Sequence, residues 1–351
     1  MKAKLLIFLL FAGFVYWLIT RYGSHFDYGY KQLKGQFMVI YEAEPIERRL
    51  ADPEFPDSLR QKIDLIVQVK KYAIDSLGFM STNNYSTYFQ EPNHTLLWML
   101  TGCKPYAFEE KEWCFPLVGC FGYKGFFDST AALQEIENIK KEGFEPDLGP
   151  VAAWSTLGIL PDPILSSMLK KEDWKLIQLV FHELTHTVIY AKNAVDFNEN
   201  LANFVADKAT RQFIRHQFPN DTAWHKQVAE SMNDRRLFLN YMFTGFQQLD
   251  SLYKSMNPDQ PIAEKERMKS ACLDSIFKRF TSLPFRHPER FNYLRNNRDG
   301  WTNNMFLSYR RYDFDRPELE AVFNQEAKGN LKLFVANMKT KYGSRGLFDL
   351  L

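Results

Sequence analysis

The sequence predicts a mainly α protein with a small β-sheet, an α+β fold. Apolar residues recur at steps of three and four over long stretches before residue 78 and again after residue 163. Short aromatic and β-branched runs broken by Pro, Gly and Asn are concentrated between residues 85 and 160. With 351 residues, the chain can form one large core or two modest ones.

The composition is that of an ordinary globular protein. Apolar residues make up 45% of the chain and aromatic residues 16%, which favours packed cores and excludes general disorder. The 44 basic and 42 acidic residues are well mixed and leave a net charge of only +2. Because no basic stripe is present, we expect no nucleic-acid partner.

The N-terminal 22 residues predict a signal-anchor. Lys2 and Lys4 precede residues 5–20, which carry no charge and would reach about 24 Å as a helix. No small-x-small cleavage site and no Cys follow this run. We therefore expect an uncleaved membrane segment over residues 1–22, with the chain beyond Arg21 exported. A cleaved signal peptide and a buried core helix are the alternatives.

The rest of the chain divides into residues 23–150, a helical region followed by a small sheet, and residues 151–351, a helical region that carries the motif described below. The strongest amphipathic pattern predicts a helix over residues 57–77 that ends at Gly78. The other expected elements are a helix at 28–44, a sheet within 85–127, a helix at 129–141, a strand at 149–160, and helices after Pro163, including a long one at 221–256.

Four cysteines are compatible with export. Cys103, Cys114 and Cys120 lie close together in sequence and could form one disulfide, whereas Cys272 is remote. None of the spacings is C-x-x-C, so a zinc ribbon and a thioredoxin-like motif are not supported. Buried, unpaired cysteines are the alternative.

A metal-binding pattern lies in the predicted helix over residues 174–190. His182 and His186 are four residues apart, which places both imidazoles on one helix face, one turn apart. Glu183 follows the first His and is placed to act as a general base, as in H-E-x-x-H zinc peptidases. Two surface histidines are the alternative, but the surrounding residues are strongly apolar, and burying these groups without a metal would be costly.

Glu199 is the predicted third ligand of one zinc ion per chain. Catalytic zinc usually has three protein ligands. The metzincin pattern H-E-x-x-H-x-x-G-x-x-H is not met, because its Gly and third His positions hold Ile189 and Lys192. We expect Asn198 to cap a second helix, which would place Glu199 in its first turn, as in gluzincins. Asp196 is the main rival, and a charge favourable to the helix N-terminus is the non-metal interpretation of Glu199.

Asn203 and Asp207, which lie further along the second helix, are candidates to orient a metal-binding side chain by a hydrogen bond without binding the metal themselves. Asn203 is four residues after Glu199, where many gluzincins have an Asp, and its carbonyl could accept an imidazole N–H. Asp207, four residues later, could take this role or could be a solvated helix residue.

The chain as a whole resembles an aminopeptidase family of bacterial exported zinc proteins. The matching residues are Gly35-Gln36, Cys114-Phe115-Pro116, Gly119-Cys120, 123–128, 153–158, Asp162-Pro163, 181–186, 197–199 and Asn303-Asn304. Two positions depart from the family pattern: Trp154 stands where Tyr is expected, and Ala206 where an acidic residue is expected. The resemblance implies a gluzincin-like zinc-peptidase core, peptide substrates, and a bacterial inner-membrane protein with its catalytic region in the periplasm.

The expected reaction is peptide hydrolysis by metal-activated water, with Glu183 as general base. Tyr309 and Tyr312 are candidate donors to the developing oxyanion. Asp128 and Asp162 are candidate anchors for a free α-amine, and the edge of a strand at residues 152–156 could pair with substrate. A membrane-associated zinc endopeptidase and a non-catalytic, zinc-stabilised envelope protein are the alternatives to an aminopeptidase.

Overall fold

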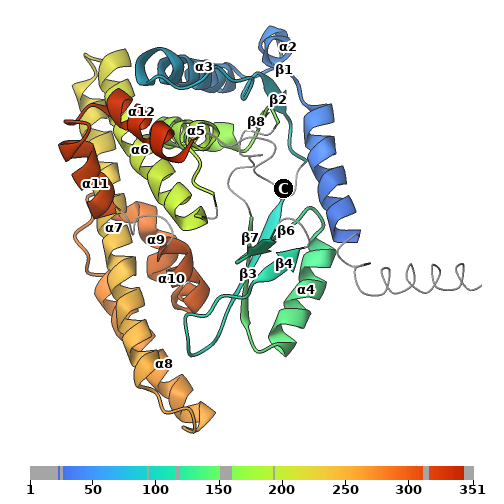
Figure 1. The fold of residues 1–351 in the computed structure, drawn as a ribbon, viewed down its shortest axis with the longest axis vertical. Coiled ribbons are helices and arrows are strands. Elements are labelled where there is room, and N and C mark those ends of the chain that lie inside the picture. The colour runs from blue at the N-terminus through green and yellow to red at the C-terminus, as the bar shows by residue number, and fades with distance from the viewer. Residues whose placement is uncertain are drawn as a thin grey trace, which may run out of the picture.

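The computed structural model describes residue 23 and residues 27–92, 95–115, 119–150, 160–192, 194–310 and 316–343. The described chain is mostly helical with short strands, as predicted (Figure 1). The predicted anchor at residues 1–22 lies outside the described residues. Among the helices that are described, none is long and apolar enough to cross a bilayer.

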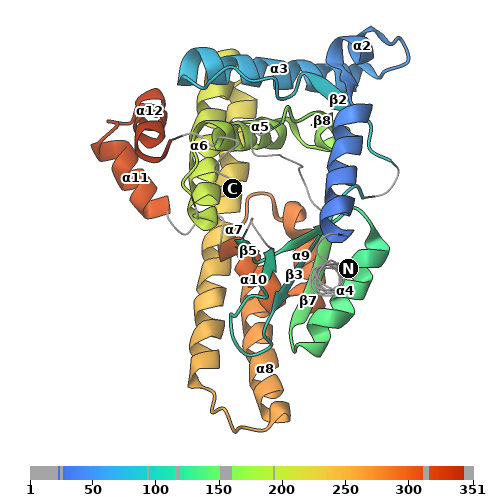
Figure 2. The same ribbon diagram turned by 45° about the vertical axis from the view of Figure 1, so that its right-hand side comes forward.

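The first helical core is built around three long helices (Figure 2). These are α3 (Asp57–Leu77), α5 (Asp173–Val188) and α6 (Val195–Gln217), with α11 (Arg316–Gln325) and α12 (Leu331–Tyr342) packed against α6. The helix predicted at 57–77 is confirmed, and Gly78 ends it with φ 76°, a left-handed conformation that suits glycine. Buried side chains from α3, α5 and α6 form one continuous apolar cluster.

A small sheet lies beside this core. Its strands are β1 (Glu44–Pro45), β2 (Thr87–Phe89) and β8 (Ile164–Leu165), in the order β1-β2-β8, with α2 (Ile46–Ala51) following β1 and the 3₁₀ turn η1 (Met168–Lys170) following β8. Tyr88 is paired with Ile164 in a parallel register. The expectation that everything after Pro163 is helical is therefore wrong at β8, because a two-residue strand leaves no periodic pattern in the sequence.

A second sheet has the order β6-β3-β7, with β3 (Trp98–Cys103) between β6 (Lys124–Phe126) and β7 (Glu145–Pro150). Both pairings are antiparallel, and α4 (Ser129–Lys141) packs on the sheet. The predicted helix at 129–141 is confirmed, with the Asp128 side chain capping its first turn. The prediction of one small sheet was too simple: the described strands form two three-stranded sheets and a separate hairpin. Residues 151–159 of the predicted strand lie outside the described residues.

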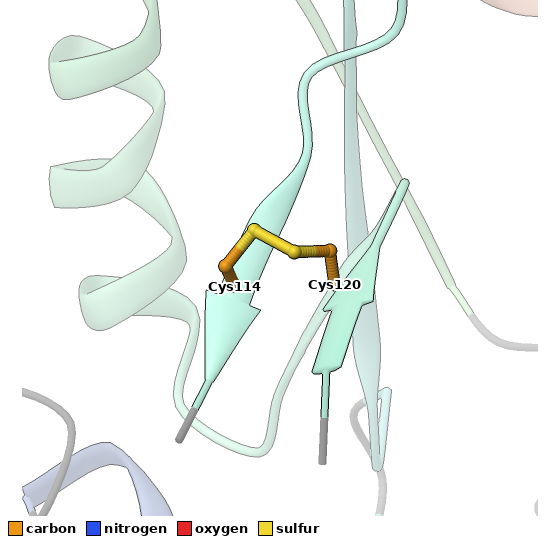
Figure 3. Close-up of a disulfide and its surroundings, with 2 residues drawn as sticks. All are labelled: Cys114 and Cys120. Atoms are coloured by element: carbon orange, nitrogen blue, oxygen red, sulfur yellow. A yellow bond between two sulfur atoms is a disulfide. The ribbon is translucent and has the colours of Figure 1, made fainter. Parts of the chain in front are cut away.

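That hairpin carries a disulfide. Its strands β4 (Trp113–Phe115) and β5 (Gly119–Phe121) are antiparallel, with Cys114 opposite Cys120. The two cysteines are bonded to each other (Figure 3). Cys103 is buried and unbridged, and Cys272 is also unbridged. The disulfide thus joins the closest pair of the three cysteines that the sequence grouped.

The second helical core is rich in aromatic rings. It is formed by α7 (Thr222–Ser255), α8 (Ile262–Phe280) and α10 (Asn303–Arg310), with the short elements η2 (Pro288–Phe291), α9 (Asn292–Asn296) and η3 (Arg298–Gly300) between α8 and α10. The long helix predicted at 221–256 is confirmed as α7. A Cβ at Gly245 would lie 2.6 Å from the Phe306 ring, so glycine allows α7 and α10 to approach closely.

Candidate metal centre

α5 carries both predicted histidines and is mostly buried. Ten of its 16 residues are buried, among them His186, which is 3% exposed, and Glu183, which is 8% exposed. The apolar residues Ile177, Phe181 and Leu184 fix the helix in the first core. Its polar side chains are therefore held in an environment where unpaired groups would be costly.

α6 packs antiparallel to α5, and polar side chains pair across the contact at intervals of four residues. His186 pairs with Glu199. One turn away, the Nδ1 atom of His182 lies 3.1 Å from Oδ1 of Asn203. One turn further, Gln178 donates to Asp207. Because four residues return a helix to nearly the same face, these pairs form one polar row along the α5–α6 contact.

Three side chains in this row converge on a point. The Nε2 atom of His182 lies 3.1 Å from Nε2 of His186, and each lies 3.3 Å from a different Glu199 oxygen. In a tetrahedral zinc site with bonds of about 2.0–2.1 Å, neighbouring ligand atoms are about 3.3 Å apart. The donor atoms and their spacing therefore fit a metal ion, and His182, His186 and Glu199 form a group that could hold one.

The charges in this group stabilise one another. Burial opposes ionisation of Glu199, but hydrogen bonds from His182 and His186 and their positive charge hold the pKa of this carboxyl well below its usual range. Burial likewise opposes charging of His182, and contact with Glu199 and the charge of Glu183 outweigh it, so the pKa of His182 is raised. The two histidines thus share a strongly anionic environment, which suits a cation.

Asn198 does not cap a helix, so that prediction was wrong. α6 begins at Val195, and Asn198 lies in its first turns. The Asn198 side chain accepts a hydrogen bond from the Ala191 amide at 2.8 Å and donates to the Ala191 carbonyl at 2.9 Å. These two bonds hold the loop between α5 and α6 against the first turn of α6. Asn198 thereby helps to hold the next residue, Glu199, opposite the histidines, while the rival Asp196 is exposed.

The two residues predicted to support the ligands have separate contacts. Asn203 faces His182, and an Nδ1–H donating to its carbonyl oxygen would leave the Nε2 lone pair of His182 for a metal. Asp207 instead accepts from Gln178 and, at 2.7 Å, from Arg316. Ala206, where the family resemblance leads us to expect an acidic residue, is fully buried.

A model of the family described as "Putative aminopeptidase" matches residues 27–343. The chain belongs to this family. The match spans both helical cores, the sheets and the candidate metal centre, which accords with the resemblance seen in the sequence. No curated protein and no solved structure matches the chain.

Tyr85 is a candidate site residue that the sequence analysis did not select. It is 3% exposed and has φ 62°, a conformation rare for a bulky side chain. Its amide donates to the Asp162 carbonyl at 2.7 Å. Burial raises the pKa of Tyr85 well above its usual value, and the negative charges of Glu183 and Asp162 raise it further. The positive φ of this buried tyrosine and the influence of the Glu183 charge on it could be seen only in the structure.

The remaining predicted residues lie in several places. Tyr309 contacts Phe238 in the second core, with ring centroids 4.8 Å apart, and its catalytic role stays a prediction. Tyr312 and residues 152–156 lie outside the described residues. Asp128 caps α4. Asp162 is 1% exposed and exchanges two hydrogen bonds with Asn84, which places it next to Tyr85.

Proposed function

We propose that this protein is a zinc-dependent, gluzincin-like peptidase that removes residues from the free N-terminus of peptides. The observation that carries the proposal is the convergence of His182, His186 and Glu199 with mutual distances of 3.1–3.3 Å. Glu183, the residue after the first histidine, is buried in the same helix. A purely structural metal site needs no such carboxylate, so its presence favours hydrolysis. Membership of the aminopeptidase family supplies the substrate class.

Each residue has a chemical role in this proposal. When bound, zinc would supply a Lewis acid that polarises the scissile carbonyl and makes a water easier to deprotonate. Glu183 takes a proton from the attacking water and delivers it to the leaving amine. Asn203 holds the orientation of His182, as carboxylates and carbonyls do for metal-binding histidines in general.

Tyr85 is our added candidate for the donor that stabilises the developing oxyanion, beside Tyr309 and Tyr312. The Tyr85 hydroxyl is protonated at neutral pH, as the ordinary tyrosine pKa already requires and the raised pKa reinforces, so it can donate a hydrogen bond. The charge of Glu183 is one of the causes that raise the pKa of Tyr85. Its fixed backbone position next to Asp162 would hold the ring in place.

Asp162 is our candidate for holding the substrate's α-amine. Asp128 caps the N-terminus of α4, whereas Asp162 is a buried carboxylate that accepts a hydrogen bond from Asn84 and whose charge reaches Tyr85. A carboxylate at this place could pair with an ammonium group and fix the distance from the N-terminus to the cleaved bond. Asp162→Asn should then reduce cleavage of free-amine peptides more than cleavage of N-acetylated ones.

The test is to load the full chain with zinc and assay it on peptides of one sequence with free and with acetylated N-termini. We expect cleavage of the free peptide, and a loss of about 10²–10⁴-fold in Glu183→Gln at unchanged zinc content. Glu137→Gln, an exposed carboxylate variant on α4, is the matched control. Cleavage of both peptides alike would favour an endopeptidase, and unchanged activity in Glu183→Gln would refute the mechanism.

We also propose that residues 1–22 anchor the protein in the bacterial inner membrane, with the catalytic region in the periplasm. The uncharged run at residues 5–20 supports the anchor. The exposed Cys114–Cys120 disulfide supports an oxidising compartment. Fractionation should recover the full chain with membranes, and protease added to spheroplasts should degrade the region beyond the anchor. A cytosolic pool of full-length protein would contradict this placement.

A further inference from the structure

The helix of residues 27–42, here called the N-terminal helix, is fixed to the protein by one face. Val39 on that face is fully buried, and a Cβ at Gly35 would lie 2.3 Å from the Phe127 ring. Gln32 and Tyr28 both donate hydrogen bonds to the Gly125 carbonyl of β6, at 2.8 and 3.0 Å. The helix is therefore held against β6 and the start of α4, with its other face turned outward.

The outward face is apolar. Tyr30, Leu33, Phe37 and Tyr41 are 66%, 72%, 70% and 80% exposed. Their spacing of three, four and four residues places them on one side of the helix, opposite Val39. The Phe37 and Tyr41 rings are stacked on each other in solvent.

This concentration is unusual within the described residues. With Met38, the N-terminal helix holds five of the fourteen large apolar side chains that are strongly exposed in the described part of the chain. Scattered exposed apolar residues need no explanation, but a continuous apolar face on a well-packed helix indicates an interaction surface. The exposed cations Lys34 and Lys31, the latter paired with Asp27 at 2.8 Å, lie along the same stretch.

We propose that this face, Tyr30, Leu33, Phe37 and Tyr41, lies against the surface of a lipid bilayer. Six residues separate the helix from the uncharged run at 5–20, and an extended chain of that length reaches roughly 20 Å. If that run enters a membrane, the apolar face is held close to the bilayer surface. Aromatic rings with neighbouring lysines suit the interface between acyl chains and anionic headgroups.

A second copy of this chain fits the face less well. A 16-residue helix is about 24 Å long and about 10 Å wide, so this face could bury about 240 Å² on each of two partners. The sum of about 480 Å² is well below the roughly 1,200 Å² of a stable protein interface. A bilayer needs no matching partner surface. This inference rests on the proposed membrane anchor and not on the proposed hydrolytic function.

The first test is photo-crosslinking of the full chain in vesicles of phosphatidylcholine and phosphatidylglycerol. A benzophenone amino acid replaces Phe37 or Leu33 in the test proteins, and Ile262 or Tyr293 in the controls. Ile262 and Tyr293 are equally exposed, at 74% and 75%, and belong to α8 and α9, away from the N-terminal helix in Figure 1. We expect lipid adducts at positions 33 and 37 and none above background at 262 and 293.

A second measurement uses thermal unfolding. Vesicles should raise the Tm of the full chain, because contact with the N-terminal helix stabilises the folded state. The rise should be lost in Leu33→Ser/Phe37→Ser and kept in Ile262→Ser/Tyr293→Ser. The proposal is overturned by adducts to a second copy or another protein at position 37, by equal lipid adducts at all four positions, or by no lipid adduct at 33 and 37.

Discussion

The two helical cores use buried polar groups in different ways. Between α5 and α6, one nitrogen each of His182 and His186 and the Glu199 carboxylate converge as a group that could hold a metal ion. In the second core, the buried Asn303 side chain accepts a hydrogen bond from Tyr253 at 2.8 Å and donates to the carbonyls of Lys104 and Pro105. Asn303 supplies the hydrogen-bond partners that these groups need, and it carries no charge. The charged groups buried on α7 and α8, Asp234 and Lys269, are also bonded within the protein, to backbone amides and to Glu145. Three side chains that converge on one point can hold a ligand, whereas a group whose hydrogen bonds all go to the protein supports the fold.

The largest expected effect is loss of metal on removing Glu199. In Glu199→Ala the two imidazoles keep their positions on α5 but lose the carboxylate 3.3 Å from each. We expect purified protein to change from about one zinc per chain to little or none, because three protein ligands are usual for such sites. Elemental analysis after dialysis measures this.

Asp196→Asn is the control for the same experiment. Asp196 is exposed in the first turn of α6, so its loss should leave zinc content unchanged. If Asp196→Asn releases the metal while Glu199→Ala retains it, the ligand assignment is wrong.

The next effect is on turnover. Tyr85→Phe should lower kcat by about 10²–10³-fold, the usual cost of removing one oxyanion donor. Zinc content should not change, because Tyr85 is not one of the converging ligands. Initial rates at saturating peptide measure the effect.

Tyr88→Phe is the matched control for that variant. Tyr88 is another buried tyrosine, on β2, and its hydroxyl donates to Gln90. Full activity in Tyr85→Phe, together with a large loss in Tyr309→Phe or Tyr312→Phe, would transfer the donor role to one of the originally predicted tyrosines.

The sequence predicted those elements whose boundaries are encoded locally. The helices at 57–77 and 129–141 were placed correctly because Gly78 ends one and Asp128 caps the other. Asn198 misled the prediction because its residue type favours a cap, while its actual bonds go to Ala191 in the preceding connection. Side-chain type shows what a residue can bond, and only the fold shows what it does bond.

In the candidate site, too, only the residues that local sequence brings together were predictable. His182 and His186 are brought together by helix periodicity alone, and Glu199 follows from the short connection between two packed helices. Tyr85 depends instead on a contact with Asp162 and on the charge of Glu183, both far away in sequence. Its positive φ has no local sequence signal such as glycine.

A moderate loss of zinc affinity is expected when Asn203, which contacts His182, is replaced. Asn203→Ala removes the acceptor facing Nδ1 of His182 and should weaken zinc binding by about 10–100-fold, as loss of such supporting partners usually does. Asn203→Asp keeps an acceptor and should retain tight binding. Competition with a zinc chelator measures affinity, and Asn138→Ala, an exposed position on α4, is the control. Equal affinity in Asn203→Ala and wild type would remove Asn203 from the site.

The smallest expected effect on zinc binding is that of Asn303→Ala, a substitution in the second core that is compared with Asn203→Ala. Asn303→Ala leaves the Tyr253 hydroxyl and the carbonyls of Lys104 and Pro105 without their buried partner. This should lower the free energy of unfolding by about 1–3 kcal/mol, measured by urea titration. Zinc affinity should stay at the wild-type value, because Asn303 belongs to the core of α7, α8 and α10 and not to the α5–α6 contact. If Asn303→Ala weakened zinc binding as much as Asn203→Ala does, the two cores could not be separated into one that binds metal and one that only supports the fold.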